Sequence, residues 1–516
     1  MLRLLRAGRN LARLSQIALT LARHDALFPL EGISGMAPIL TLARLARRRS
    51  PVPMRQGERL AAALQALGPS FIKLGQALST RADLVGEDIA SDLAALRDRL
   101  PPFPSAEARA TIAAELEAPV ETLFQSFEDT PVAAASIAQV HLAITSEGRP
   151  VAVKVLRPGI KAAFARDIDL FLWIADLVER TQPALRRLKP TAVVNTFAET
   201  VWLEMDLRSE AAAASELRHN LKNDPDFRVP EMDWRRTGRQ VMTSERVAGI
   251  PIDERERLIA AGHEPRKILE KAANAFFKQV FRDGFFHADL HPGNLFVAED
   301  GAIVAVDFGI MGRLDRRTRF YLADMLLGFL TGDYRRVAEV HFDAGYVPQR
   351  QSLEAFAQAC RSIGEPILER PLHEISLARL LAQLFEVTER FEMETQPQLL
   401  LLQKTMLVAE GVGRRLDPTV NMWTLARPLI EDWMRENRGL EARLLDAAAD
   451  VRTLLDRMPS LVHNLERVAS TLVNDGLQLD SEALGALRER REAAMLLSMP
   501  LWLIALALLA IAAALW

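Results

Sequence analysis

Two short motifs place acidic side chains at a spacing that suits phosphoryl transfer. The first reads His-Ala-Asp-Leu-His-Pro-Gly-Asn over residues 287–294, and the second is Asp-Phe-Gly at residues 307–309. In phosphoryl transfer a carboxylate positions the attacking hydroxyl group, and hard oxygen ligands hold Mg²⁺ on the phosphates. The residue types, their order and their spacing match the catalytic half of a kinase site. They predict that Asp289 positions the nucleophile and that Asn294 and Asp307 are the magnesium ligands.

The residues between the two motifs predict a β-hairpin. Residues 294–297 and 302–306 are apolar and favour strands, and Asp300-Gly301 between them suits a tight turn. Such a hairpin brings the predicted magnesium ligands to the same end of a small sheet. The alternative is two unrelated acidic loops that flank a hairpin of the core.

A lysine upstream supplies the other half of the predicted site. Lys154 lies in the apolar run Val-Ala-Val-Lys-Val-Leu at residues 151–156, and the whole chain has nine lysines. Burying a lysine costs free energy unless its ammonium is paired. In a kinase its partners are the α- and β-phosphates and a glutamate on a helix. The alternative is an edge-strand lysine whose ammonium reaches water.

Residues 204–210, which read Glu-Met-Asp-Leu-Arg-Ser-Glu, contain the candidate partners of this lysine. Glu204 and Glu210 are the two glutamates, and Asp206 shares a helix face with Glu210 at i, i+4 spacing. A solvated acidic helix face is the alternative, and periodicity alone does not exclude it.

The position of a kinase glycine-rich loop holds alanines instead. Ala133, Ala134 and Ala135 precede Ser136 there, and alanine resists the backbone conformations that let glycine fold closely over phosphates. We expect these four residues to bind the nucleotide through a stiffer loop. No Ala-Pro-Glu follows the Asp-Phe-Gly triplet, and residues 310–319 run directly into a helical pattern that leaves little room for a peptide-binding activation loop. Both features argue against an ordinary protein kinase.

Together these residues resemble the UbiB family of atypical kinases, the ADCK-type proteins linked to ubiquinone biosynthesis. Lys73-Leu74-Gly75-Gln76 is similar to the K-x-G-Q signature of that family. The alanine-rich loop, the Glu-x-Asp at residues 204–206 and the run at residues 287–294 also match. The resemblance extends over roughly residues 60 to 350. It implies an α+β fold, that of a two-lobed atypical protein kinase with a helical N-terminal extension.

The resemblance implies roles for further residues. Lys73 and Gln76 would lie on the helical extension, which would fold over the nucleotide site. There they would meet Glu204 and Asp206 and obstruct protein substrates. Glu210 would be the partner of the buried lysine. The alanine-rich loop would alter the nucleotide preference and suppress protein phosphorylation.

The resemblance also implies a function, that of a kinase-like, lipid-responsive ATPase that supports ubiquinone biosynthesis. ATP or ADP and Mg²⁺ would be its cofactors. Membrane lipids, quinone precursors and quinone-biosynthesis enzymes would be its partners. A small-molecule or lipid kinase is the nearest enzymatic alternative, and a nucleotide-gated scaffold for quinone enzymes is an alternative from another class. A flavin hydroxylase is disfavoured, because Gly411-Val412-Gly413 opens no dinucleotide fingerprint.

Both ends of the sequence suggest contact with a membrane. Residues 493–516 carry no charge, are long enough to span a bilayer and follow three nearby arginines. They predict a transmembrane helix in the bacterial inner membrane with the catalytic domain on the cytoplasmic side. A homodimer or partner helices would complete this single-span anchor. Residues 1–23 are Arg-rich and amphipathic, which suits a membrane-surface helix, a packing helix with a basic outer face, or a transit peptide.

The proline-rich breaks in the sequence give the remaining domain boundaries. We expect a helical extension over residues 1–104, an N-lobe over 105–247, a helical C-lobe over 248–492 and the anchor over 493–516. A last strand of the N-lobe would enter a hinge, where backbone groups near Glu245 and Val247 would meet adenine.

Composition and the histidines add less. The net charge of −3 gives no general nucleic-acid signal, and the single cysteine suits a reducing compartment. His287 and His291 stand at i, i+4 spacing, which could suggest a metal pair. We expect instead that His287 is structural and that His291 shapes the loop.

Overall fold

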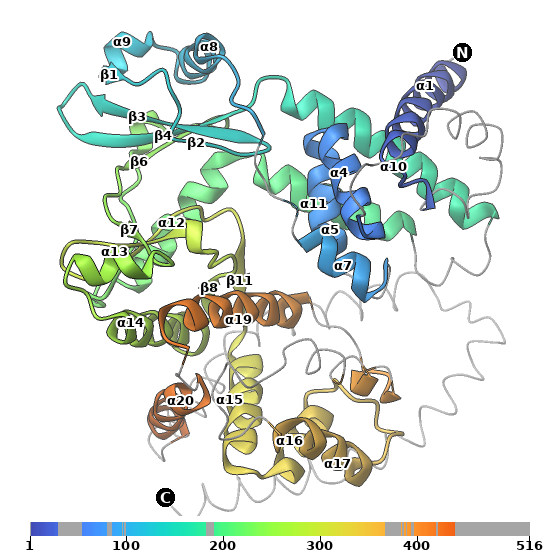
Figure 1. Ribbon diagram of the computed structural model, residues 1–516, viewed down its shortest axis with the longest axis vertical. Helices are drawn as coiled ribbons and strands as arrows, with labels where there is room; N and C mark the ends of the chain where they lie inside the picture. Colours follow the sequence, from blue (N-terminus) through green and yellow to red (C-terminus); the bar gives the residue numbers. More distant parts are fainter. Residues whose placement is uncertain are drawn as a thin grey trace, which may run out of the picture. The chain divides into compact units, whose positions relative to one another are not determined.

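The computed structural model describes most of the chain up to residue 438 (Figure 1). The core and the site belong to the compact unit Met1–Met434. Among the described residues no helix is both long enough and apolar enough to cross a membrane. The span predicted at residues 493–516 lies outside them, so it stays a prediction. The described ranges are 2–28, 54–79, 85–94, 96, 100–181, 190–366, 383, 386–388, 390–393, 397–418 and 422–438.

Four helices within the described part of the N-terminal extension share one apolar core. Leu14 and Ile17 of helix α1 are buried there together with Phe71 of helix α5. On the flank of α1, the guanidinium of Arg13 donates to both carboxylate oxygens of Asp167 at 2.9 and 3.1 Å. The described apolar face of α1 is therefore a packing surface, as the packing-helix alternative predicts, and it does not face a bilayer. The helices are α1 (Leu2–Arg23), α4 (Gln56–Leu67), α5 (Pro69–Ser79) and α7 (Glu87–Ala94).

A five-stranded antiparallel sheet forms the N-lobe, in the order β1-β3-β4-β6 with β2 paired to β3. Alternate residues of a strand point to opposite faces. Val151, Val153 and Val155 of β4 are buried in a cluster with Ile112, so Lys154 points to the other face. The strands are β1 (Phe124–Phe127), β2 (Ala133–Ala134), β3 (Ala138–Thr145), β4 (Pro150–Leu156) and β6 (Val241–Glu245).

Five helices accompany this sheet. Helix α12 begins after Asp206, whose carboxylate accepts from the N–H of Arg208 at 3.2 Å and so caps the helix. Glu210 therefore lies in the first turn of α12, and Glu204 lies at the end of the preceding helix, α11. The helices are α8 (Ser105–Leu116), α9 (Val120–Leu123), α10 (Ile160–Thr181), α11 (Pro190–Glu204) and α12 (Leu207–Asn220).

The predicted hairpin between the two acidic motifs is confirmed. Strands β9 and β10 pair antiparallel with Val297 opposite Ile303. Gly301 in the turn has a φ of +78°, a conformation that favours glycine. Asn294 directly precedes β9, and Asp307 follows shortly after β10. The strands of the two smaller sheets are β5 (Phe227–Arg228), β7 (Ile250–Pro251), β8 (Phe285–His287), β9 (Leu295–Val297), β10 (Ile303–Ala305) and β11 (Met311–Arg313).

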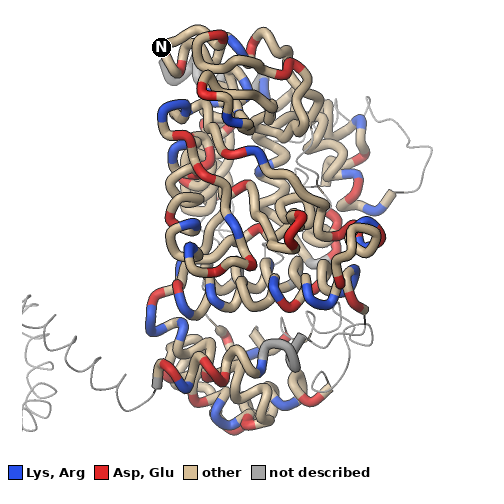
Figure 2. The backbone as a smooth tube through the Cα atoms, turned by 90° about the vertical axis from the view of Figure 1, so that its left-hand side faces the viewer, with Lys and Arg blue, Asp and Glu red and all other residues tan. Residues whose placement is uncertain are grey.

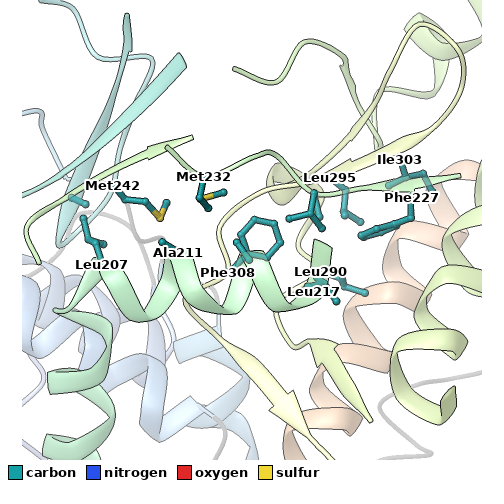
Figure 3. Close-up of a cluster of buried hydrophobic side chains, with 14 of the residues drawn as sticks. Leu207, Ala211, Leu217, Phe227, Met232, Met242, Leu290, Leu295, Ile303 and Phe308 are labelled. Carbon is teal, nitrogen blue, oxygen red and sulfur yellow. The ribbon is translucent and has the colours of Figure 1, made fainter. Parts of the chain in front are cut away.

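One apolar cluster joins helix α12, the N-lobe sheet and the hairpin (Figure 3). It includes Ala211 of α12, Met242 of β6 and Leu295 of β9. Leu290 and Phe308, one from each acidic motif, are 6% and 2% exposed within it. Full burial of a large apolar side chain contributes roughly 1.5–3 kcal/mol. Both motifs are therefore anchored in the same core.

The segment after Asp-Phe-Gly is short. Strand β11 ends at Arg313, and Asp315 then caps helix α15 by accepting from the N–H of Thr318 at 2.8 Å. The prediction that little room remains for a peptide-binding activation loop is therefore confirmed. The C-lobe helices that the structure describes are α13 (Arg255–Ala260), α14 (Pro265–Phe277), α15 (Arg316–Thr331), α16 (Tyr334–Asp343), α17 (Leu353–Gly364), α19 (Pro397–Leu416) and α20 (Met422–Arg438).

Acidic and basic residues are interspersed along the described chain (Figure 2). Many form exposed pairs one helical turn apart, such as Arg266 with Glu270 at 3.3 Å and Arg335 with Glu339 at 3.2 Å. Such pairs each contribute about 0.2–0.5 kcal/mol to their helices. Lys154 differs from them because only 15% of its side chain is exposed.

Candidate active site

Lys154 lies between two carboxylates that come from different parts of the fold. Its ammonium donates to Oε1 and Oε2 of Glu210 at 2.7 and 2.9 Å, and to Oδ1 of Asp307 at 3.1 Å. Strand β4 supplies the lysine, helix α12 the glutamate and the end of the hairpin the aspartate. Of the two candidate glutamates, the structure places Glu210 beside Lys154. The cluster joins a cation that could bind phosphates to a carboxylate that could bind a metal ion.

The charges of this cluster shift one another's pKa values. Burial opposes the charged form of Lys154, but Asp307 and Glu210 raise its pKa above the ordinary value. Burial and the Asp307 charge raise the pKa of Glu210 to about 7, although Lys154 opposes this rise. Lys154 lowers the pKa of Asp307, which is half exposed, to about 2. Asp307 is therefore ionised at neutral pH, as a metal ligand must be.

Phe308 anchors Asp307 in an uncommon backbone conformation. Asp307 has a φ of +63°, in the left-handed region, which costs a non-glycine residue roughly 1–2 kcal/mol. Phe308 is buried in the core, and its ring centroid lies 5.4 Å from that of the buried His287 ring. The burial of Phe308 offsets the strain, and the Asp307 carboxylate faces Lys154 rather than the core.

His287 is a structural residue, as predicted. It belongs to residues 287–294, which we call the catalytic loop because they contain the predicted catalytic residue Asp289. Its buried ring accepts a hydrogen bond at Nδ1 from the N–H of Asp289 at 3.1 Å. Its Nε2 lies 3.2 Å from the carbonyl oxygen of Val306. A neutral ring protonated on Nε2 satisfies both bonds, and burial lowers the pKa of His287. Nδ1 of His291 accepts from the N–H of Gly293 at 3.1 Å, so this residue shapes the loop.

Asn294 closes the catalytic loop onto Asp289. Its Nδ2 donates to the carbonyl oxygen of Asp289 at 3.0 Å, and its own backbone carbonyl accepts from the N–H of Val306 at 2.9 Å. Because the amide nitrogen is engaged in the loop, Oδ1 is the side-chain atom that would face a cation. Asn294 and Asp307 thus offer hard oxygen donors from the two sides of the hairpin.

This donor set fits Mg²⁺. The ion usually takes one or two protein ligands and completes its octahedral shell with phosphates and water. Over the described ranges no group of three or more His, Cys, Asp and Glu residues could hold a metal ion. A metal site built by this part of the chain would therefore rely on Asn294, Asp307 and the nucleotide itself.

The alanine-rich loop is partly a strand. Ala133 and Ala134 form β2, which pairs with β3. The N–H of Ala135 donates to the carbonyl oxygen of Ala138 at 2.8 Å, which closes a turn around the fully buried Ser136. This pairing agrees with the stiff loop expected from the sequence. Contact of these residues with a nucleotide stays a prediction.

One backbone group of the predicted hinge, the N–H of Glu245, is hydrogen-bonded within the protein. The N–H of Glu245 donates to the carbonyl oxygen of Glu231 at 2.8 Å, because β6 is bordered by that segment. This N–H is therefore already engaged, and contact of other backbone groups near Glu245 with adenine stays a prediction. Val247 lies beyond the end of β6, in the connection to β7, and its role as an adenine contact stays a prediction.

The K-x-G-Q motif lies on helix α5 and reaches the site. Nζ of Lys73 is 2.8 Å from a carboxylate oxygen of Glu204, and each side chain is 13% exposed. The Lys73 charge also contributes to the lowered pKa of Asp307. Asp206, which the resemblance places near this motif, pairs with the guanidinium of Arg208 at 2.9 and 2.6 Å. Gln76 lies on the same helix, in the turn that follows Lys73.

Known proteins are similar to this chain in sequence and in fold. A model of the ABC1 atypical kinase-like domain matches residues 95–341, and a model of the UbiB helical domain matches residues 360–421. The probable protein kinase UbiB of Marinobacter nauticus is 43% identical over 464 residues, which are 88% of this chain and 85% of that protein. The chain belongs to the UbiB family. Its kinase-like fold of mixed helices and strands agrees with the fold expected from the sequence.

Another UbiB relative and a solved structure are also similar to this chain. The probable protein kinase UbiB of Azotobacter vinelandii is 42% identical over 463 residues, which are 88% of this chain and 85% of that protein. The structure of Rv3197 from Mycobacterium tuberculosis, solved as a complex with erythromycin, is 26% identical with a TM-score of 0.51. That alignment covers 72% of this chain and 95% of the other.

Sequence reasoning missed two residues of the UbiB helical domain that touch the catalytic loop. Nζ of Lys404 on helix α19 is 3.4 Å from Oδ1 of Asp289. The hydroxyl of the neighbouring Thr405 lies 3.1 Å from the carbonyl oxygen of Ala288 and 2.8 Å from that of Leu401 on its own helix. These residues lie in no recognisable motif. The scarcity of lysine in the chain was the one signal that could have drawn attention to Lys404.

Proposed function

We propose that this UbiB-family protein is a membrane-anchored, Mg²⁺-dependent ATPase that supports ubiquinone biosynthesis. The observation that carries the proposal is the Lys154 ammonium held between Glu210 and Asp307. The relatives named probable protein kinase UbiB support the link to phosphoryl transfer.

The site residues would divide the reaction among them. Lys154 would bind the α- and β-phosphates of ATP, and Glu210 would keep its ammonium in place. Asn294 and Asp307 would hold Mg²⁺, which when bound draws charge from the phosphate oxygens. Asp289 would position the acceptor hydroxyl and take its proton as the new bond to phosphorus forms.

Water is the acceptor that we favour. Helix α15 begins directly after β11, so the usual docking segment for a peptide is short. The pair of Lys73 and Glu204 holds the helical extension close to the same site, since the Lys73 charge acts on Asp307. A water molecule needs no docking surface, whereas a lipid or small-molecule hydroxyl would need one.

The fate of a labelled γ-phosphate tests the proposal. We expect its release as inorganic phosphate, and a loss of about 100-fold or more in this rate for Asp307→Asn with the protein still folded. Asp300→Asn is the matched control, because Asp300 lies in the turn of the same hairpin and is half exposed. Near-normal hydrolysis by folded Asp307→Asn protein would refute the assigned role. Label in a lipid would show a lipid kinase, and no turnover at all would favour a nucleotide-gated scaffold.

The cellular setting forms part of the proposal. The uncharged residues 493–516 and the arginines before them support a place at the bacterial inner membrane with the catalytic domain in the cytoplasm. Membrane lipids, quinone precursors and quinone-biosynthesis enzymes are the proposed partners. A homodimer would pair two single-span anchors.

A further inference from the structure

The catalytic loop contains no cation of its own. Residues 287–294 include neither lysine nor arginine. Lys154 is held among the carboxylates of Glu210 and Asp307, where it would meet the α- and β-phosphates. During transfer, negative charge is spread over the oxygens of the terminal phosphoryl group, and a positioned cation stabilises that charge. The terminal phosphoryl group therefore lacks a side-chain cation from the loop that holds Asp289.

Lys404 reaches this loop from the helical domain. Its ammonium is 3.4 Å from Oδ1 of Asp289, and 38% and 33% of the two side chains are exposed. The distance is long for a charge-assisted hydrogen bond, which is usually about 2.7–2.9 Å. The ammonium therefore keeps hydrogens for a second anionic group next to the same carboxylate.

The helix behind Lys404 is fixed to the catalytic loop by two contacts. Thr405 is fully buried, and its hydroxyl lies 3.1 Å from the carbonyl oxygen of Ala288 and 2.8 Å from that of Leu401, so the two oxygens share its one hydrogen. Leu402 is 6% exposed in a cluster that contains Phe286 and Ala288. These contacts fix the position and rotation of α19 against the loop. Lys404 is therefore placed beside Asp289 by the packing of the core and not by a surface ion pair alone.

We propose that Lys404 binds the terminal phosphoryl group of ATP while Asp289 binds the acceptor. The inference rests on the proposed function and adds a residue from the helical domain to its site. The bond from the terminal phosphorus to the β-γ bridging oxygen breaks, and its electron pair leaves with ADP. The acceptor oxygen forms the new bond to phosphorus, and its proton passes to Asp289. Lys404 stays protonated and pairs with an oxygen of the moving phosphoryl group.

An inhibitory ion pair is the competing explanation. In that case Lys404 would only neutralise Asp289, and its removal would speed turnover. Partly exposed ion pairs contribute about 0–1 kcal/mol, which is too little to hold Asp289 in an inactive state. The geometry therefore favours a phosphate-binding role.

The test compares nucleotides with and without a terminal phosphoryl group. In the full chain with Mg²⁺, calorimetry would measure the affinities of ADP and of the non-hydrolysable β,γ-imido analogue of ATP. We expect Lys404→Met to weaken analogue binding about tenfold, the size of one charged hydrogen bond, and to change ADP binding by less than about twofold. Turnover should fall at least as much. Lys404→Arg should restore most of the analogue affinity. Gln403→Met, a change at the exposed neighbour on α19, should behave like the wild type.

Each outcome decides the inference separately from the proposed function. Equal changes in both affinities, an unchanged analogue affinity, or faster turnover of Lys404→Met would overturn the role of Lys404. If the wild type binds both nucleotides without hydrolysing ATP, the ATPase proposal fails, yet the affinity comparison still tests Lys404. A wild type that binds neither nucleotide would overturn both. Lys404→Arg keeps the charge and serves as the second variant if Lys404→Met does not fold.

Discussion

The ammonium of Lys154 donates to both carboxylate oxygens of Glu210, at 2.7 and 2.9 Å, across the gap between strand β4 and helix α12. Glu210 is 7% exposed and Lys154 is mostly buried, so the pair is shielded from water. Losing one partner of such a pair leaves the other buried charge less well compensated. The position of α12 relative to β4 therefore sets the position of the Lys154 ammonium, the proposed phosphate-binding cation.

Glu210→Gln should impair catalysis more than folding. Lys154 keeps its contact with Asp307, yet it loses the charged carboxylate of Glu210 that centres its ammonium. Misplacing a catalytic group by about 1 Å can lower the rate about 100-fold. We expect ATP turnover to fall by about that factor. Glu216→Gln, on the same helix, removes an exposed pair with Arg313 and should change the free energy of unfolding by less than about 1 kcal/mol. Wild-type turnover by Glu210→Gln would contradict the assigned role.

Gly75 of the K-x-G-Q motif should be needed for helix packing. A Cβ at this position would lie 2.4 Å from Cδ1 of Leu96 and 2.8 Å from Cδ1 of Leu64. Such overpacking costs about 1–3 kcal/mol, and the better helix propensity of alanine in α5 offsets about 0.5–1 kcal/mol of it. Gly75→Ala should therefore lower the free energy of unfolding by up to about 2 kcal/mol in denaturant titrations. A Cβ added at Gly411 on α19 would meet no atom within 4 Å. Gly411→Ala should stabilise the protein by about 0.5–1 kcal/mol, and similar effects of the two changes would argue against close packing at Gly75.

Protonation of His287 should destabilise the protein in mild acid. Because burial lowers its pKa in the folded protein, unfolding takes up a proton once the pH falls below the ordinary value near 6.5. The stabilisation from the neutral ring is thus fully present above about pH 6.5 and is lost as the pH falls toward the folded pKa, at up to ~1.4 kcal/mol per pH unit. The free energy of unfolding, measured from pH 8 to pH 5, would contain this slope together with the opposite contribution of Glu210, whose pKa is raised to about 7.

His287→Asn provides the comparison for that measurement. The asparagine keeps an acceptor for the N–H of Asp289 but does not titrate. As the pH falls, we expect the free energy of unfolding of this variant to decrease less steeply than that of the wild type. The two slopes should differ by up to ~1.4 kcal/mol per pH unit, the contribution of one proton. Identical slopes for the two proteins would show that His287 does not carry this dependence.

Deleting residues 493–516 should release most of the protein from membranes and leave its nucleotide affinity within about twofold. A spanning helix binds a bilayer far more strongly than a surface helix. The described apolar face of α1 is buried and offers no substitute. Sedimentation of membranes at low and high salt would measure the release, and fusion of an unrelated spanning helix should restore membrane binding. If the truncated protein still sediments with membranes at high salt, the main anchor lies elsewhere.

The sequence was sufficient for the catalytic loop, the hairpin and the short segment after Asp-Phe-Gly. Each of these depends on local spacing and turn chemistry, as with the glycine at position 301 between two apolar runs. The local pattern left both Glu204 and Glu210 open as partners of Lys154, whereas the family resemblance implied Glu210, which the structure places beside Lys154.

Other parts of the site depend on contacts that no local pattern encodes. Lys404 lies more than 100 positions after Asp289 in an apolar helix, and only packing brings them together. The N–H of Glu245 is taken by Glu231, a partner outside the predicted last strand. Asp206, which the resemblance places near the K-x-G-Q motif, pairs with Arg208 two positions along the chain. The motif alone gave no reason to expect this ion pair.

Helices α11 and α12 connect two ion pairs through a very short turn. Glu204 at the end of α11 binds Lys73 of the helical extension, and Glu210 in the first turn of α12 binds Lys154. A ligand that alters the first pair therefore acts on the same piece of backbone as a nucleotide bound at the second. Thermodynamic linkage is reciprocal. If such a ligand changes the affinity for nucleotide by some factor, the nucleotide must change the affinity for that ligand by the same factor. The protein can therefore report the presence of either molecule through its binding of the other.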